Sequence, residues 1–81
     1  MIPRHAREQI EGRGISLDSV ENAAEKGELF FSETNHRFGT KKYSLLKVGE
    51  DTLVVVWFWN KNREKEVVTA YWRKRRREWK A

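Results

Sequence analysis

The longest uninterrupted apolar stretch, residues 53–59, constrains this chain more than any other feature. It is far shorter than the roughly 18 apolar residues of a membrane-spanning helix, so we expect no transmembrane segment. Its valines and tryptophans favour extended structure, and an apolar run without polar alternation is typical of a strand covered on both faces. We therefore predict a buried central strand at residues 52–59, in which at least one of Trp57 and Phe58 is nearly fully buried.

Shorter strands are predicted on either side of the central one. They lie at residues 29–31, 41–48 and 66–73, and turns are expected at residues 35–39, 49–51 and 60–62. Such short connections favour antiparallel neighbours. Alternation in the last strand would place Val68, Ala70 and Trp72 on one face, with Trp72 in the core. We expect Asn60 and Asn62 to accommodate any positive φ in the last turn.

Two helices are predicted before the sheet. Ile2, Ala6 and Ile10 are spaced four apart, which is typical of one apolar helix face. Ser16 is a favourable N-cap, and Gly27 would end the second helix in a left-handed conformation. The expected fold is therefore α+β, with two N-terminal helices packed on a three- to four-stranded antiparallel sheet. We expect one domain over residues 1–81: a helix at 3–12, a helix at 16–27, a sheet over 28–73 and a basic tail at 74–81.

The net charge of +5 is distributed unevenly along the chain. Residues 1–35 carry a net charge of −3, whereas residues 36–81 carry +8. Basic and aromatic residues interleave in the second half, where cations could neutralise phosphates and exposed rings could stack on unpaired bases. The expected partner is therefore RNA or another polyanion, although the charge could also serve solubility alone. The predicted nucleic-acid-binding residues are Lys41, Lys42, Arg73, Arg75, Arg76 and Arg77.

Several kinds of chemistry are excluded by what the sequence lacks. There is no cysteine, so a disulfide scaffold, a cysteine-ligated zinc site and a thiol nucleophile are ruled out. The two histidines, His5 and His36, lie too far apart for a metal motif, and no glycine-rich phosphate loop follows a strand. We therefore expect no bound metal and no cofactor. Because no apolar leader precedes the first helix, we expect a cytoplasmic protein.

Two motifs together resemble a known family. The first runs from His5-Ala6 through Gln9 to Arg13-Gly14-Ile15-Ser16, and the second is the strand Val67-Val68-Thr69-Ala70-Tyr71 with Trp79 beyond it. They resemble the motifs of a widespread prokaryotic family of small proteins of unassigned function. That family is similar in layout to RelE/ParE- and BrnT-like toxins and to small metal-independent microbial ribonucleases. The chain departs from the family after Tyr71, where residues 73–77 are basic.

The resemblance implies roles for particular residues in metal-free RNA cleavage. His5 would act as base or acid, and Tyr71 as the second proton donor or as a positioning group. Arg13 and Arg37 would stabilise the phosphate charge, and Thr69 would orient the phosphate or His5. A competing interpretation makes His5, Arg13, Thr69 and Tyr71 a buried polar cluster that joins the helices to the sheet, without any chemistry.

Three function classes follow from these observations. The leading hypothesis is a toxin-like RNA-binding protein with an acidic antitoxin-like partner, for which a metal-independent endoribonuclease activity stays open. The alternative is a non-catalytic module that binds nucleic acid or an acidic protein. The third class is a purely structural or interaction protein.

Overall fold

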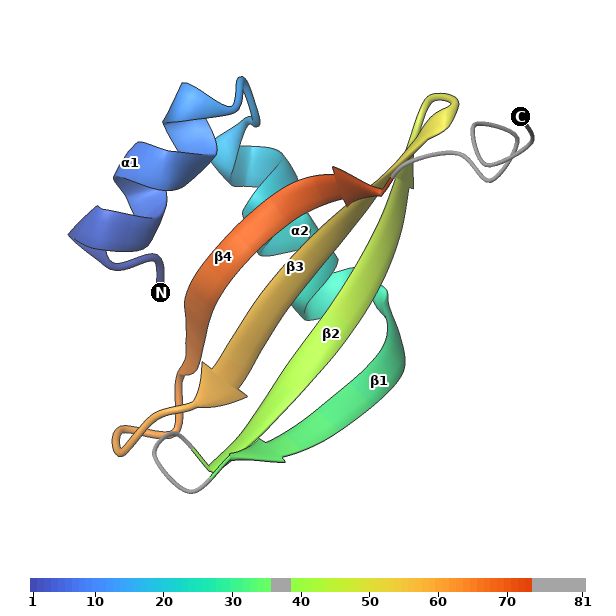
Figure 1. Cartoon of the computed structure of the whole chain (residues 1–81). Coiled ribbons are helices and arrows are strands. Elements are labelled where there is room, and N and C mark those ends of the chain that lie inside the picture. The colour runs from blue at the N-terminus through green and yellow to red at the C-terminus, as the bar shows by residue number, and fades with distance from the viewer. Residues whose placement is uncertain (36–38, 74–81) are drawn as a thin grey trace.

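The computed structural model describes residues 1–35 and 39–73 of the chain. Two helices precede a four-stranded antiparallel sheet in which the strands follow one another in sequence order, β1-β2-β3-β4. Both helices lie on the same side of the sheet, and the other side is left open (Figure 1). The α+β prediction, with helices first and an antiparallel sheet after them, is therefore confirmed. The elements are α1 (Arg4–Gly12), α2 (Leu17–Lys26), β1 (Glu28–Asn35), β2 (Gly39–Val48), β3 (Asp51–Trp59) and β4 (Lys65–Arg73).

The two helices form where the local sequence predicts them. Pro3 stands at the N-cap of α1, and Ala6 and Ile10 are buried on its inner face. At the start of α2, the hydroxyl of Ser16 accepts hydrogen bonds from the backbone N–H groups of Asp18 and Ser19. These bonds satisfy donors that the first helical turn would otherwise leave without partners.

The end of α1 fixes the position of Arg13. Gly14 has a φ of +71°, and its N–H donates to the carbonyl of Glu11, while the N–H of Ile15 donates to the carbonyl of Ile10. This pair of bonds is the Schellman arrangement, which closes a helix through a left-handed residue. Arg13 is consequently the C-cap residue of α1, where its positive charge lies beside the negative end of the helix dipole.

The end of α2 differs from the prediction. Gly27 has a φ of −68° and a ψ of 161°, so it is extended and not left-handed. A Cβ atom at Gly27 would clash with the carbonyl oxygen of Ala23 and lie 2.6 Å from the carbonyl oxygen of Leu45 on β2. Glycine is needed here because the backbone carbonyls of Ala23 and Leu45 leave no room for a side chain, not because of its backbone angles.

The core lies between the helices and one face of β3 and β4. Leu53, Val55 and Trp57 point from β3 into this core, where Val67 and Ala70 of β4 join them. Trp57 is only 5% exposed, which confirms that at least one of the two aromatic residues predicted for the core is nearly fully buried.

A bulge in β4 overturns the predicted alternation. Val56 pairs with Thr69, but the next residue, Trp57, pairs with Val67, so Val68 is an extra residue in the strand. The side chain that reaches the core is therefore that of Val67 and not that of Val68. The prediction that Trp72 belongs to the core is also wrong, since 36% of this residue is exposed.

The hairpins are longer than the sequence predicted. β1 and β2 pair from Glu28 opposite Leu45 to Asn35 opposite Gly39, although residues 32–35 are polar. Pairing to β2 supplies hydrogen bonds that their local sequence does not reveal. In the β3–β4 turn the positive φ falls on Arg63, and not on an asparagine as predicted. None of the helices in residues 1–35 and 39–73 is long and apolar enough to cross a membrane.

Candidate nucleic-acid interface

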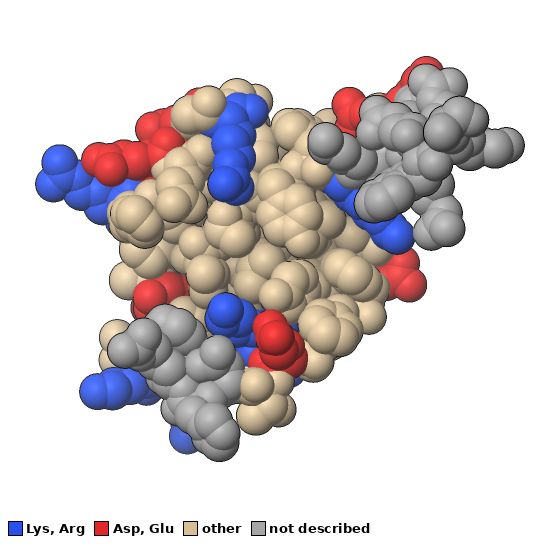
Figure 2. Space-filling model, viewed as in Figure 1, with Lys and Arg blue, Asp and Glu red and all other residues tan. Residues whose placement is uncertain are grey.

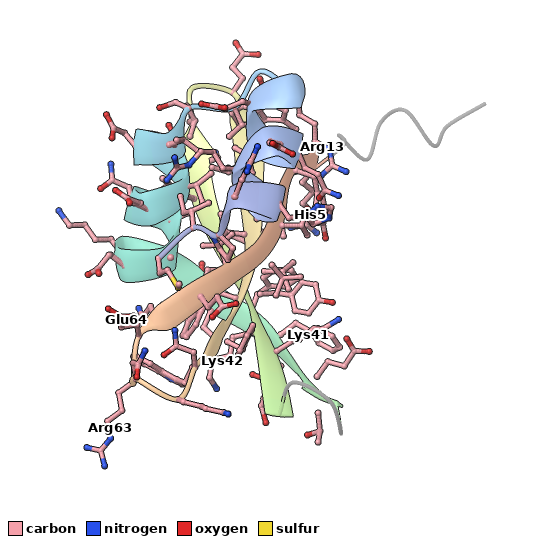
Figure 3. The ribbon with its side chains drawn as sticks, turned by 90° about the vertical axis from the view of Figure 1, so that its left-hand side faces the viewer. His5, Arg13, Lys41, Lys42, Arg63 and Glu64 are labelled. Carbon is pink, nitrogen blue, oxygen red and sulfur yellow. The ribbon has the colours of Figure 1, made fainter. Side chains whose placement is uncertain are left out.

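One face of α1 carries the residues of the opening motif. His5, Gln9 and Arg13 follow at intervals of four residues, and Nε2 of Gln9 lies 3.4 Å from Nε2 of His5. Figure 3 shows His5 and Arg13 pointing the same way from α1, away from α2. His5 is exposed. The helix therefore presents an accessible imidazole and a guanidinium on one side.

Arg13 is bound to the edge of the sheet. Its Nη1 donates to Oγ1 of Thr69 at 3.1 Å and to the carbonyl oxygen of Ala70 at 2.8 Å. Within the part of the chain that the structure describes, no carboxylate forms an ion pair with Arg13. Arg13 therefore lies directly against Thr69, and the guanidinium keeps a net positive charge beside β4.

The open face of the sheet has a continuous row of side chains that leads to Arg13. Phe31 pairs with Tyr43, Tyr43 with Val56, and Val56 with Thr69. Directly paired residues point to the same face, so these four side chains lie side by side across the sheet. The row begins at the edge strand β1 and ends where Arg13 contacts Thr69.

Two neighbouring rows complete this face. Leu45 pairs with Val54, which pairs with Tyr71, and Tyr71 is 38% exposed. Val54 and Val56 are almost fully buried even though no helix covers them. The third row is Lys47, Thr52 and Arg73, and both of its cations are exposed. The open face thus has an apolar and aromatic centre, and the cations Lys47 and Arg73 lie in the row at the C-terminal end of β4.

The surroundings of Tyr43 on the open face keep its hydroxyl protonated. The hydroxyl of Tyr43 donates to Oε1 of Glu33 at 3.2 Å. Partial burial raises the pKa of Tyr43, and the negative charge of Glu33, its hydrogen bond and the proximity of Tyr71 raise it further. Tyr43 therefore stays protonated at neutral pH and acts as a hydrogen-bond donor. Figure 2 shows this side of the molecule with a largely uncharged centre and charged side chains mainly towards its margins.

The remaining predicted binding residues do not form one patch. Lys42 pairs with Trp57, which points to the helix side, whereas Lys41 pairs with Glu33 on the open face. Adjacent residues of a strand point to opposite faces, so the two lysines cannot bind one flat ligand together. Both are labelled in Figure 3. Arg37, Arg75, Arg76 and Arg77 lie outside the described residues.

Comparison with protein families shows which family the chain belongs to. A family profile described as a domain of unknown function, DUF4258, matches residues 2–72. The chain belongs to the DUF4258 family. The match covers the opening motif and the strand at residues 67–71, with His5, Arg13, Thr69 and Tyr71, and it ends before Trp79. No curated protein and no solved structure matches this DUF4258 domain, so no relative supports a likeness to RelE, ParE or BrnT toxins.

Sequence reasoning missed the aromatic residues at the free edge of the DUF4258 domain. Phe30 and Phe31 are 46% and 50% exposed, and both rings lie near Tyr43. Two consecutive phenylalanines in a short strand were a signal, but strict alternation would have put one of them in the core.

Neither a cluster of metal-ligating side chains nor the pocket at the β3–β4 turn coincides with the site residues that the structure describes. The residues that the structure describes contain no cluster of three or more His, Asp or Glu side chains that could hold a metal ion. An open pocket of about 460 Å³ lies at the β3–β4 turn, and Met1, Trp59 and Glu66 are among its lining residues. None of the predicted site residues within 1–35 and 39–73 lines it.

Proposed function

We propose that this DUF4258 domain binds RNA on the open face of its sheet and cleaves it without a metal, in the manner of a toxin. One observation carries the proposal. Arg13, at the end of α1 and on the same face as the exposed His5, is held by hydrogen bonds to Thr69 and Ala70 of β4. Metal-free phosphodiester cleavage uses both a cation and a proton-transfer group, and one face of α1 presents both. The exposed cations Lys47 and Arg73 on the open face add attraction for a polyanion.

The reaction follows from these groups. His5 removes the proton from a ribose 2′-hydroxyl, whose oxygen attacks the adjacent phosphorus. The bond between phosphorus and the 5′-oxygen breaks, and Tyr71 donates a proton to the leaving oxygen. The products are a 2′,3′-cyclic phosphate and a free 5′-hydroxyl. Arg13 stabilises the charge that develops on the phosphate oxygens, because its guanidinium is already oriented.

Thr69 has a positioning role in this scheme. Its hydroxyl accepts a hydrogen bond from Arg13, so it orients the guanidinium, and its own proton stays available to a phosphate oxygen. The same contact could serve only to join α1 to the sheet. The competing functions are therefore a non-catalytic nucleic-acid module and a structural protein, and an acidic antitoxin-like protein would be attracted to the same cations.

The deciding experiment is His5→Ala, measured for both cleavage and thermal stability. We expect cleavage per folded molecule to fall about 100-fold or more, while RNA binding changes little, since general acid–base catalysis contributes about that much. The matched control is His36→Ala, which removes the other histidine of the chain and should leave cleavage unchanged.

Two outcomes would contradict the proposal. If His5→Ala lowers the melting temperature but keeps full activity per folded molecule, His5 is a structural residue. If the wild-type protein cleaves none of a varied set of RNAs, the enzyme proposal falls, and binding alone remains to be tested.

RNA binding is tested separately through its salt dependence. Replacing basic residues of the C-terminal region with glutamine should flatten the dependence by roughly 0.7 in slope for each lost contact to a single strand. Lys26→Gln, on the helix side, is the control and should leave the slope unchanged. An unaltered slope in the multiple variant would exclude this region from the interface. The residues replaced are Arg73, Arg75, Arg76 and Arg77.

A further inference from the structure

Three rings form an aromatic patch at the free edge of the open face, made of Phe30, Phe31 and Tyr43. The ring of Tyr43 lies 5.2 Å from that of Phe31 and 6.1 Å from that of Phe30, and both pairs meet edge to face. Half of the Phe31 residue is exposed, and nearly half of Phe30. Large exposed rings at adjacent positions lose the benefit of burial, so they indicate a surface that binds something.

The patch exists because β1 is irregular. The register breaks between Leu29, which pairs with Ser44, and Phe31, which pairs with Tyr43. Phe30 is therefore an extra residue opposite β2, and its ring can reach Tyr43 together with that of its neighbour. The hydroxyl of Tyr43 is held by Glu33, which fixes the ring that supports the two phenylalanines.

The patch and Arg13 lie at opposite ends of the same row. Phe31, Tyr43, Val56 and Thr69 stand on four adjacent strands, and strands are spaced about 4.8 Å apart, so the row spans about 14 Å. A stacked nucleic-acid strand advances about 3.4 Å per nucleotide, so about four nucleotides cover that distance. A strand bound at Arg13 through a phosphate can thus place bases about four nucleotides away on the patch.

We propose that the aromatic patch stacks unpaired bases of single-stranded RNA whose backbone is held at Arg13. This inference rests on the proposed function and names its substrate class. Bases in a duplex are stacked on one another and cannot reach a flat aromatic surface, so a strand or loop with unpaired bases is required. The cations on the same face, Arg13, Lys47 and Arg73, match the charge of a nucleic acid better than that of an apolar protein segment.

The test compares two probes that carry the same backbone charge. One is a short 2′-O-methylated oligoadenylate, which lacks the hydroxyl needed for cleavage, and the other is an abasic oligomer of equal length. Wild-type protein should bind the oligoadenylate more tightly. Phe31→Leu, which keeps apolar bulk but removes the ring, should weaken that binding about 5- to 150-fold, the range expected for loss of one stacked base. Binding of the abasic oligomer should not change.

Matched variants make the test specific. Phe31→Tyr keeps a ring and should retain the preference for bases. Leu29→Ala removes an equally exposed side chain from the same strand, but Leu29 pairs with Ser44 on the helix side, so binding should not change. Arg13→Gln should weaken binding of both probes and flatten its salt dependence, because it removes a phosphate contact.

The outcomes separate this inference from the function on which it rests. If wild-type protein binds both probes equally, or if Phe31→Leu keeps the preference for bases, the patch does not stack bases, although RNA binding itself stands. If wild-type protein binds neither probe, the proposed function fails too. If the wild-type protein is a dimer in sedimentation experiments and Phe31→Leu makes it a monomer, the patch is a protein interface and the inference is wrong.

Discussion

The buried pair of Trp57 and Ser44 allows the core to be tested quantitatively. Nε1 of Trp57 donates to Oγ of Ser44 at 2.9 Å, and the two residues are 5% and 2% exposed. Nζ of Lys65 lies 4.6 Å from the centre of the Trp57 ring and also donates to the carbonyl of Ala24 on α2. Trp57 thus holds β2, β3 and β4 together under the second helix.

Removing either residue of this pair leaves the polar group of the other buried without a hydrogen-bond partner. Trp57→Phe takes away the indole N–H and part of the ring, which leaves the Ser44 hydroxyl buried without its donor. That loss costs about 1–3 kcal/mol, and the lost ring volume brings the total to about 2–4 kcal/mol. Ser44→Ala leaves the indole N–H of Trp57 without its acceptor and should lower the free energy of unfolding by about 1–3 kcal/mol. In the double variant neither the hydroxyl nor the indole N–H is present. Its loss of stability should therefore be smaller than the sum of the two single losses by about 1 kcal/mol or more.

The free energy of unfolding is measured by urea titration of the wild-type protein and the three variants, followed by far-ultraviolet circular dichroism. Trp72→Phe is the control, since Trp72 is 36% exposed, and its cost should be under about 1 kcal/mol. Strictly additive costs would refute the coupling between Trp57 and Ser44. A Trp57→Phe cost below about 1 kcal/mol would show that the indole does not lie in the core.

Two further predictions concern backbone packing and pH. Gly27→Ala should lower the stability by about 1–3 kcal/mol in thermal melts, because the new methyl group would meet backbone, including the carbonyl of Leu45. Gly12→Ala is its control, because open space surrounds that position and alanine favours helix, so equal melting temperatures for the two variants would refute the argument. The raised pKa of Tyr43 means that folding favours its protonated form, so this contribution is present below about pH 10 and is lost as the pH rises through the pKa of the folded protein. The melting temperature of the wild-type protein should therefore fall more steeply above about pH 10 than that of Tyr43→Phe, in which the phenol beside Glu33 is absent, and parallel profiles would contradict this.

Local sequence was sufficient for the order and type of the elements. The four-residue spacing of Ile2, Ala6 and Ile10 predicts α1, and the hydroxyl of Ser16 caps α2 as expected. The first five residues of the apolar run, 53–57, are the most buried part of the sheet, whereas Trp59 at its end is exposed. These features depend on side-chain periodicity and on bonds between near neighbours, which any reader of the sequence can evaluate.

The candidate site was predictable only in part. The positions of His5 and Arg13 on one helix face follow from their spacing, and their link to Thr69 and Tyr71 came from a family resemblance. The hydrogen bond between Arg13 and Thr69 joins residues 56 positions apart, so it exists only once α1 packs on β4. Lys41 and Lys42 look like one basic pair in the sequence, but strand geometry sends them to opposite faces.

Tertiary structure alone decided where the two irregularities of the sheet fall. Alternation along a strand is a local property with a period of two, and it predicts the faces correctly until an extra residue is inserted. The extra residue in β4 sends Val67 to the core in place of Val68, and the one in β1 lets Phe30 join Phe31 beside Tyr43. Whether such a residue is accommodated depends on the register of the partner strand and on what the helices cover, which are contacts between distant segments. The aromatic patch therefore depends on strand pairing and not on any motif in the sequence.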